Sequence, residues 1–207
     1  FFRPNFWPNT PDILPEFLQV ANRAGYIQRL VLAATLSSNY GMYGPAFELM
    51  ERTPTHPGKE EYLDSEKYEI KNWNFDDPSS LRKIITRVNE IRKENEALQN
   101  TRSLKFHRID NEALVCYSKV SDDLENIILV VVSLDPHHTH AGWLHFPVTE
   151  FGMHAHDSYQ VHDLISGAHF LWSGEHNFVE LDPGVMPVHI FKVRRKVRTE
   201  RDFDYFM

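Results

Sequence analysis

One carboxylate, Asp12, lies in a loop of the kind that carries functional groups. It ends an aromatic segment, and prolines stand at positions 8, 11 and 15. Because proline fixes φ and lacks an amide hydrogen, no strand or helix can run through this stretch, and Pro15 is suited to open the next helix. A strand-to-helix loop of this kind carries catalytic groups in α/β barrels. The alternative is that Asp12 only caps the following helix.

A second set of candidates lies in the run Glu60 to Ile70, which is dense in charge and in tyrosine and contains Lys67 and Tyr68. Carboxylates, amides and ammonium groups hydrogen-bond sugar hydroxyls, while aromatic faces stack on the apolar faces of pyranose rings. With Asp12 and Asn9, these residues have the chemistry of a carbohydrate site. The alternative is that the run is a solvated face, as charge-rich runs usually are.

Histidines are concentrated between positions 137 and 156, where six occur. In extended segments, the pairs His138/His140 and His154/His156 would share faces, but a zinc site needs further ligands, and Cys116 offers only one thiolate. We therefore expect loop and sheet-face histidines rather than a metal centre. No G-x-S-x-G nucleophile elbow is present, so a hydrolase triad of that kind is not predicted.

Composition limits the class of protein. The 207 residues carry a formal charge of −7, which argues against a general binder of nucleic acid or anionic membranes. Cys116 has no partner for an internal disulfide and lies in an apolar run, so we expect a buried thiol in a reducing compartment. No apolar run approaches the ~20 residues of a membrane span. A cytoplasmic protein is expected.

The first hundred residues are predicted to be mainly helical. Residues 16–24 and 26–36 have helical patterns, and Gly25 suggests a break between them. A short strand is expected from Tyr40, followed by a long irregular connection over residues 46–74. Leu81 begins the clearest helical pattern, whose apolar residues recur at helical spacing as far as Ile91.

The pattern changes near residue 101, where we place a domain boundary. From there, short apolar or alternating runs are separated by turn residues, which is typical of an antiparallel sandwich or barrel. Eight strands are expected, over residues 104–109, 113–120, 126–134, 142–147, 159–163, 168–172, 177–181 and 188–193. The continuously apolar run of residues 127–132 predicts a central strand covered on both faces. Residues 196–207 form a charged tail.

Three separated motifs carry a family resemblance. They are RPNFWPNTPDIL (residues 3–14), RLVLAATLSSNYGMYGPAFE (residues 29–48) and EYLDSEKYEI (residues 61–70). In this order they closely resemble the alpha-1,4-glucan:maltose-1-phosphate maltosyltransferases of the alpha-amylase superfamily, glycoside hydrolase family 13. The resemblance implies that residues 1–100 are the last two βα units of a (β/α)8 TIM barrel. Residues 101–195 would then be the C-terminal antiparallel β-sandwich that follows the barrel.

The resemblance also implies an activity, which is the transfer of maltosyl units from maltose 1-phosphate to the non-reducing end of alpha-1,4-glucans with retention of configuration. Retaining transfer uses a carboxylate nucleophile and an acid/base carboxyl group. In the family both lie upstream of Phe1, so the chain is expected to begin in mid-domain and to be inactive alone. The resemblance implies no metal or organic cofactor, and it allows a homodimer of the full-length protein.

The resemblance assigns roles residue by residue. Asp12 matches the third family carboxylate, which holds donor-sugar hydroxyls, and Lys67 and Tyr68 match a pair that reaches the donor maltosyl unit. Asn9 is expected to help orient Asp12. Pro11 stands where starch-cleaving relatives have histidine, which favours the maltosyltransferase branch.

Two other functions remain open from the sequence. The β-domain could be a glucan-binding or structural module, for which Trp143 and Trp172 are candidate stacking platforms, although tryptophans in a sandwich are more often core residues. The chain could also be part of an amylase-like hydrolase.

Overall fold

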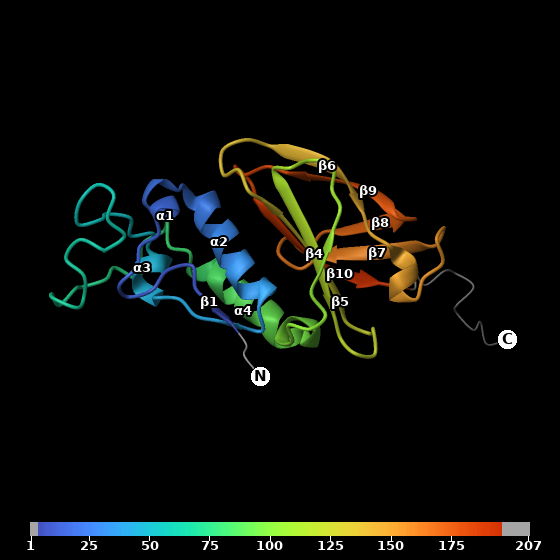
Figure 1. The fold of residues 1–207 in the computed structure, drawn as a ribbon, viewed down its shortest axis with the longest axis horizontal. Helices are drawn as coiled ribbons and strands as arrows, with labels where there is room; N and C mark the ends of the chain where they lie inside the picture. Colours follow the sequence, from blue (N-terminus) through green and yellow to red (C-terminus); the bar gives the residue numbers. More distant parts are fainter. Residues whose placement is uncertain (1–3, 196–207) are drawn as a thin grey trace.

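The computed structural model describes residues 4–195, so the predicted tail at residues 196–207 lies outside the described residues. Helices dominate the first half of the described chain, and strands make up most of the second half (Figure 1). The elements of the first half are β1 (Asn5–Phe6), α1 (Glu16–Val20), α2 (Arg23–Leu36), β2 (Asn39–Tyr40), α3 (Gly44–Glu48), α4 (Arg82–Glu94) and a 3-10 turn (Glu96–Gln99).

The short strands β1 and β2 form a parallel pair, with Asn5 opposite Asn39 and Phe6 opposite Tyr40. Parallel neighbours need a crossover connection, which α1 and α2 provide here. The unit is therefore a βαβ arrangement. The loops that leave the carboxyl ends of both strands lie on the same side of the pair, and the first of these loops contains Asp12.

The predicted break at Gly25 is wrong, because Gly25 lies inside α2 and the chain breaks earlier, at Ala21 and Asn22. Asn22 caps α2 by accepting a hydrogen bond from the Gly25 amide at 3.0 Å. Glycine is needed here for space: a Cβ at position 25 would lie 2.8 Å from the Ala21 Cβ. The glycine thus permits close packing between successive helices rather than ending one.

The clearest predicted helix is confirmed as α4, and its apolar positions 84, 85, 88 and 91 are all buried. It ends at Glu94, and Asn95 follows in extended conformation. The strand predicted from Tyr40 is shorter than expected, because Gly44 and Pro45 begin α3. Proline fits the first turn of a helix, where its missing amide hydrogen costs no hydrogen bond.

All eight predicted strands of the second half are present, and their pairings are antiparallel. They are β3 (Lys105–His107), β4 (Leu114–Val120), β5 (Ile127–Ser133), β6 (His140–His145), β7 (Ser158–Asp163), β8 (His169–Ser173), β9 (His176–Leu181) and β10 (Val188–Arg194). Six form one sheet in the order β3-β4-β5-β10-β7-β8, and β6 pairs with β9 in a second sheet.

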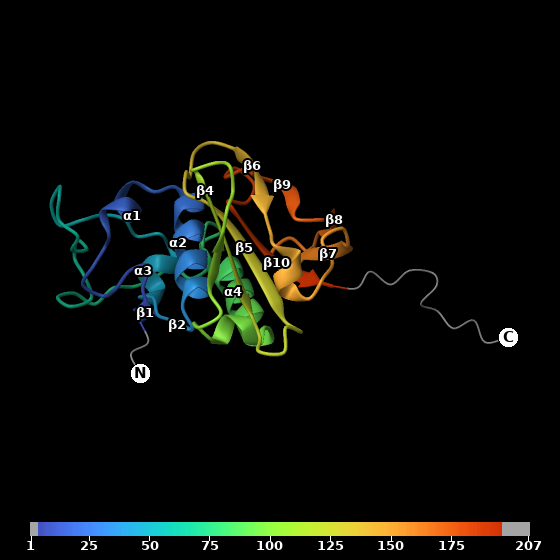
Figure 2. The ribbon, with the colours of Figure 1, turned by 45° about the vertical axis from the view of Figure 1, so that its right-hand side comes forward.

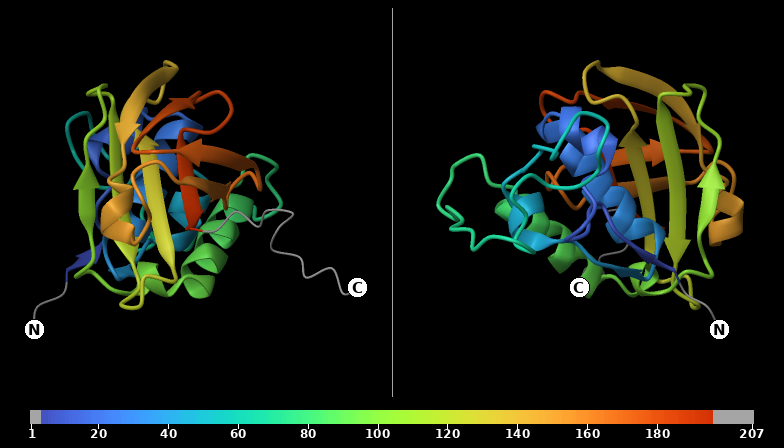
Figure 3. Two further views of the ribbon diagram at one scale, coloured as in Figure 1. Left: turned by 90° about the vertical axis from the view of Figure 1, so that its right-hand side faces the viewer. Right: turned by 60° about the vertical axis from the view of Figure 1, so that its left-hand side comes forward.

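The strand β5 lies at the centre of the structure, as its continuous apolar sequence predicts. All seven of its residues are buried. Val130 and Val132 pack in one hydrophobic cluster with α2 and α4, whereas Leu129 and Val131 pack in a second cluster with β6 and β9. The six-stranded sheet is therefore covered by helices on one face and by the β6–β9 pair on the other (Figures 2 and 3).

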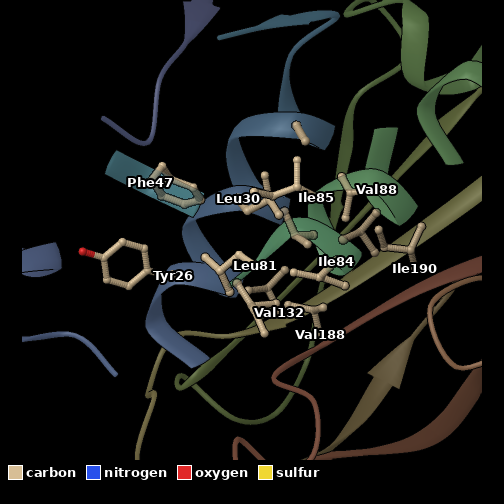
Figure 4. Close-up of a cluster of buried hydrophobic side chains, with 14 of the residues drawn as sticks. Tyr26, Leu30, Phe47, Leu81, Ile84, Ile85, Val88, Val132, Val188 and Ile190 are labelled. Carbon is tan, nitrogen blue, oxygen red and sulfur yellow. The ribbon is translucent and has the colours of Figure 1, made fainter. Parts of the chain in front are cut away.

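The helix-facing cluster joins the two halves of the chain. Leu30 of α2 and Val88 of α4 lie with Val132, Val188 and Ile190 of the sheet (Figure 4). A further set of hydrogen bonds crosses the same junction: the hydroxyls of Thr35 and Tyr117 at 2.6 Å, the Arg87 side chain to the Leu164 carbonyl at 2.8 Å, and the Asn22 side chain to the Pro136 carbonyl at 2.7 Å. Residues on both sides of position 101 thus share one core.

Burial on the other face of the sheet involves a histidine. His107 of β3 is buried, its Nε2 lies 2.7 Å from the Ser118 hydroxyl, and the rings of Phe146 and Phe151 pack against it. This desolvation lowers the pKa of His107 to about 4, with a smaller contribution from the positive charge of Lys105. The predicted buried thiol is confirmed, because Cys116 is buried in the same cluster. Among the described residues, no helix is both long and apolar enough to cross a membrane.

The shared core predicts that the two halves unfold together. Leu30→Ala should lower the free energy of unfolding by about 2–5 kcal/mol, because it leaves a cavity between α2 and β5. The half-buried Leu32→Ala, on the same helix, is the control and should cost less. Hydrogen exchange measures both halves, and we expect the amides of α2 and β5 to lose protection by the same amount. Loss confined to α2 would contradict a common core.

His107 predicts an acid-sensitive stability. Its pKa is about 4 in the folded state against an ordinary value of 6.5, so the folded protein takes up this proton later than the unfolded chain. The contribution to stability is complete above pH 6.5 and is lost as the pH falls toward 4, and the total loss is about 3 kcal/mol. Urea unfolding of His107→Gln should show a correspondingly weaker pH dependence, with the exposed His154→Gln as control. Identical pH profiles for His107→Gln and the parent would contradict this role.

Candidate functional site

Asp12 lies in a tight turn that keeps its carboxylate at the surface. Thr10 and Ile13 exchange two backbone hydrogen bonds, of 3.1 and 3.3 Å, so the turn residues Pro11 and Asp12 project outward. The helix α1 has Pro15 at its N-cap and receives no side-chain cap there. The alternative that Asp12 only caps this helix is therefore wrong, and its carboxylate is left to make other contacts.

The structure brings Lys67 to Asp12 although 55 positions separate them in the sequence. The Lys67 Nζ lies 3.6 Å from the Asp12 Oδ1, with the two side chains 54% and 68% exposed. The ammonium also lies 5.4 Å from the centre of the Tyr68 ring. Interaction with Tyr68, and then the charge of Asp12, raises the pKa of Lys67, so this side chain is cationic at neutral pH. An exposed ion pair of this kind contributes little to stability.

The side chain of Asn9, which is expected to help orient Asp12, is buried and bonds to two tyrosines. Its Nδ2 donates to the Tyr62 hydroxyl at 2.8 Å and to the Tyr43 carbonyl at 3.2 Å, while its Oδ1 accepts from the Tyr43 amide at 3.0 Å. Burial raises the pKa of Tyr62 to about 12. Asn9 thus ties the loop after β1 to the loop after β2 and to the segment that carries Lys67.

Glu66 is a residue of this region that sequence reasoning did not single out. Its carboxylate accepts hydrogen bonds from the Tyr43 hydroxyl and, at 3.0 Å, from the Trp73 Nε1. These two donors, Tyr43 first, lower the pKa of Glu66. The only sequence signal was its position beside Lys67 in a charge-rich run. Its contacts tie the segment that carries Lys67 to Tyr43 and Trp73.

The charge-rich run is attached to the rest of the fold, so it is more than a solvated face. The Leu14 amide donates to the Glu60 carbonyl at 2.6 Å, and the Gln19 side chain donates to the Lys59 carbonyl at 2.8 Å. The Glu16 amide also donates to the Glu60 carboxylate at 3.1 Å. These bonds join the run to the segment that follows Asp12. The resulting surface presents the Asp12 carboxylate, the Lys67 ammonium group and the exposed Tyr68 ring.

An apolar hollow of about 530 Å³ lies next to this loop, between β1 and α2. Phe6 and Trp7 are exposed at its edge, and Leu32 and Leu36 line it. Trp7 also packs on Gly41, since a Cβ at position 41 would lie 2.5 Å from the indole ring. The surface beside the Asp12 loop is therefore apolar on the side of the unpaired edge of β1.

The histidines make other contacts. His138 and His140 both lie within 3.0 Å of the Asp135 carboxylate, and these contacts, His140 first, lower the pKa of Asp135. Within residues 4–195, no group of three or more His, Cys, Asp or Glu side chains is arranged to hold a metal ion. The described histidines thus provide no observation that favours a metal centre.

Comparison with solved structures identifies the fold class. An AmyP variant in complex with maltotriose matches 92% of this chain and 41% of its own, with a TM-score of 0.61 at 14% identity. The maltogenic alpha-amylase AmyB from Thermotoga neapolitana matches 91% of this chain and 40% of its own, with a TM-score of 0.58 at 12% identity. The described chain therefore has a fold found within alpha-amylase-type enzymes.

Sequence comparison is more specific. The family model described as "GLGE, C-terminal" matches residues 106–193. Alpha-1,4-glucan:maltose-1-phosphate maltosyltransferases match 93% of the chain, at 56% identity in Chlorobaculum tepidum and 49% in Methylacidiphilum infernorum. The chain covers 30% and 29% of the length of these relatives. The chain is thus similar to a C-terminal portion of these alpha-1,4-glucan:maltose-1-phosphate maltosyltransferases, which confirms the resemblance in the motifs.

The contacts of Asn9 predict a structural role that is separable from chemistry. Asn9→Ala should lower the free energy of unfolding by about 2–3 kcal/mol, because it leaves buried groups of Tyr43 and Tyr62 without partners. It should also speed tryptic cleavage at Lys59 and Lys67, since the segment loses its anchor. The exposed Asn5→Ala is the matched control. Unchanged cleavage in a destabilised Asn9→Ala protein would show that Asn9 does not hold this segment.

Proposed function

We propose that this chain forms part of a retaining maltosyltransferase, which moves maltosyl units from maltose 1-phosphate onto the non-reducing end of alpha-1,4-glucans in glycogen-type synthesis. The observation that carries the proposal is the Asp12–Lys67 pair beside Tyr68, at the carboxyl end of β1. Active sites of α/β barrels are built from loops at this end of the strands. The high identity to maltosyltransferases over 93% of the chain favours this reaction over others of the class.

In this proposal Asp12 hydrogen-bonds hydroxyls of the donor sugar and favours the distorted, oxocarbenium-like ring of the transition state. Lys67 donates to the same maltosyl unit and keeps the carboxylate of Asp12 oriented, and Tyr68 offers an aromatic face. Asn9 supports the loop from beneath. The exposure of Asp12 and Lys67 supports this assignment, because both charged groups remain accessible to a sugar although they contact each other.

We further propose that residues 1–100 are the last two βα units of a (β/α)8 barrel and that residues 101–195 are the β-sandwich domain that follows it. The parallel β1–β2 pair and its helical crossover support this interpretation. So do the exposed Phe6 and Trp7 along the unpaired edge of β1, where a further barrel strand would cover them.

The nucleophile and the acid/base carboxyl group would belong to the remaining length of the enzyme. Retaining transfer needs two carboxyl groups about 5 Å apart across the reacting bond. Asp12, paired with Lys67, is the third carboxylate of this scheme rather than one of those two. The 207-residue chain alone is therefore expected to bind a sugar at most and to transfer none.

The proposed partners are maltose 1-phosphate and an alpha-1,4-glucan acceptor, with a homodimer as the assembly of the full-length protein. The net charge of −7 supports the absence of a nucleic-acid or anionic-membrane partner. The single buried Cys116 fits a cytoplasmic location, where thiols stay reduced. An amylase-like hydrolase is the alternative, and it would release reducing sugar from starch without any phosphorylated donor.

The transfer reaction tests Asp12 directly. In the full-length polypeptide, Asp12→Asn should reduce phosphate release from maltose 1-phosphate in the presence of maltohexaose by about 10²-fold or more, because a charge that stabilises the transition state is lost. Asp64→Asn, an equivalent change in a neighbouring loop, is the control and should retain full activity. Equal rates for the two variants would exclude the proposed role of Asp12. Absence of phosphate release by the folded parent enzyme would exclude the reaction itself.

A further inference from the structure

The outer face of the β6–β9 pair carries an exposed aromatic surface far from the Asp12 loop. Trp143 of β6 stands opposite Phe178 of β9, their rings are 5.6 Å apart, and they are 55% and 52% exposed. The other candidate platform, Trp172, is only 8% exposed and packs on Tyr159 and Phe191. The expectation that sandwich tryptophans are core residues is confirmed for Trp172 and is wrong for Trp143.

The backbone beneath Trp143 is held firmly in place. Its amide donates to the Asp110 carboxylate at 2.6 Å, and its carbonyl accepts from the Asp110 amide at 3.3 Å. The Asn111 side chain donates to the Ala141 carbonyl at 2.9 Å on the same strand. Glycine at position 142 makes room for this arrangement, because a Cβ there would lie 2.8 Å from the Asp110 Oδ1. Trp143 is thus presented on a fixed support although its ring is exposed.

A hollow of about 600 Å³ adjoins the Trp143 ring and is lined by groups that can bond hydroxyls. The lining residues are Arg108, Asp110, Trp143, His145 and His176. The His145 Nε2 lies 3.3 Å from the Glu175 carboxylate, and the His145 and His176 rings are 4.9 Å apart. Donors and acceptors of both charges therefore surround one aromatic face.

The charges in this hollow balance, which favours an uncharged ligand over a phosphate or a carboxylate. Arg108 brings a positive charge and Asp110 a negative charge to the lining of the hollow, and the His145 Nε2 contacts the Glu175 carboxylate at its border. An apolar ring face bordered by hydroxyl-bonding groups matches a pyranose, whose C–H face stacks on indole while its edge is polar. A peptide partner would instead favour a larger apolar patch, depleted of charge at its centre.

We propose that the Trp143–Phe178 surface is a second carbohydrate-binding site, which takes glucosyl units of an alpha-1,4-glucan chain. The choice of this sugar polymer rests on the proposed function, whereas the preference for a neutral pyranose rests on the site itself. The site lies on the β6–β9 side of the six-stranded sheet, opposite α2 and α4, so it cannot contact the same glucosyl unit as Asp12 (Figure 1). It binds long glucans at a point distant from the donor pocket and raises their local concentration there.

Binding of maltoheptaose to the 207-residue chain, measured by isothermal titration calorimetry, tests this proposal without any phosphorylated donor. Trp143→Ala should weaken binding by about tenfold or more, as truncation of a central aromatic anchor does. Trp143→Phe should restore most of the affinity, because an aromatic face remains. Phe106→Ala on β3, another exposed aromatic residue, is the matched control and should leave the affinity unchanged. Tyr68→Ala, beside Asp12, reports separately on any binding at the proposed donor pocket. Thermal unfolding verifies that each variant is folded.

The outcomes separate this proposal from the proposed function. Binding that is lost in Tyr68→Ala but kept in Trp143→Ala would overturn the second site while leaving the donor pocket intact. Absence of maltoheptaose binding in the folded parent chain would also overturn it. In the full-length enzyme, Trp143→Ala should raise the KM for a long glucan acceptor and leave the kinetics with maltohexaose unchanged. A full-length enzyme without transferase activity, whose chain still binds maltoheptaose through Trp143, would exclude the proposed function but not this site.

Discussion

The packing of α2 and α4 on the central strand β5 is the interaction on which the rest of the structure depends. β5 is apolar at six consecutive positions, so its two faces need separate covers, and the chain supplies helices for one and the β6–β9 pair for the other. The cluster around Leu30, Val88 and Val130 fixes α2 relative to the sheet. Because α2 connects β1 to β2, this packing also fixes the parallel pair and the loop of Asp12.

The candidate site is built in a second step, by polar contacts above that core. Asn9 and Tyr62 join three loops, and Glu60 accepts hydrogen bonds from the Leu14 and Glu16 amides, just after the Asp12 turn. The exposed pair of Asp12 and Lys67 lies on this support, and its weak contribution to stability means that the fold does not need it. Groups that are costly to position and add little stability are those expected to serve binding or catalysis.

Sequence periodicity predicted the elements well and their contacts poorly. The eight strands and α4 follow from alternation and from a 3.6-residue pattern, which are local properties. Periodicity does not reveal that Gly25 lets Ala21 approach, and it does not distinguish the exposed Trp143 from the buried Trp172. The approach of Lys67 to Asp12 depends on Asn9, Tyr62 and Glu66. Each of these residues makes a hydrogen bond to a residue far away in the sequence, which periodicity cannot predict. Family motifs, rather than periodicity, supplied the roles of these residues.

We infer that Asp12 and Lys67 hold the donor sugar. A crystal structure of the full-length protein with bound maltose is the sharpest test of this role. The account predicts a glucosyl unit whose hydroxyls lie within about 2.5–3.0 Å of the Asp12 carboxylate, with the Lys67 ammonium on the same maltosyl unit. The aromatic surface at Trp143 provides an internal comparison in the same crystal. A donor pocket filled by maltose, with Asp12 and Lys67 turned toward solvent and away from every hydroxyl, would contradict the account.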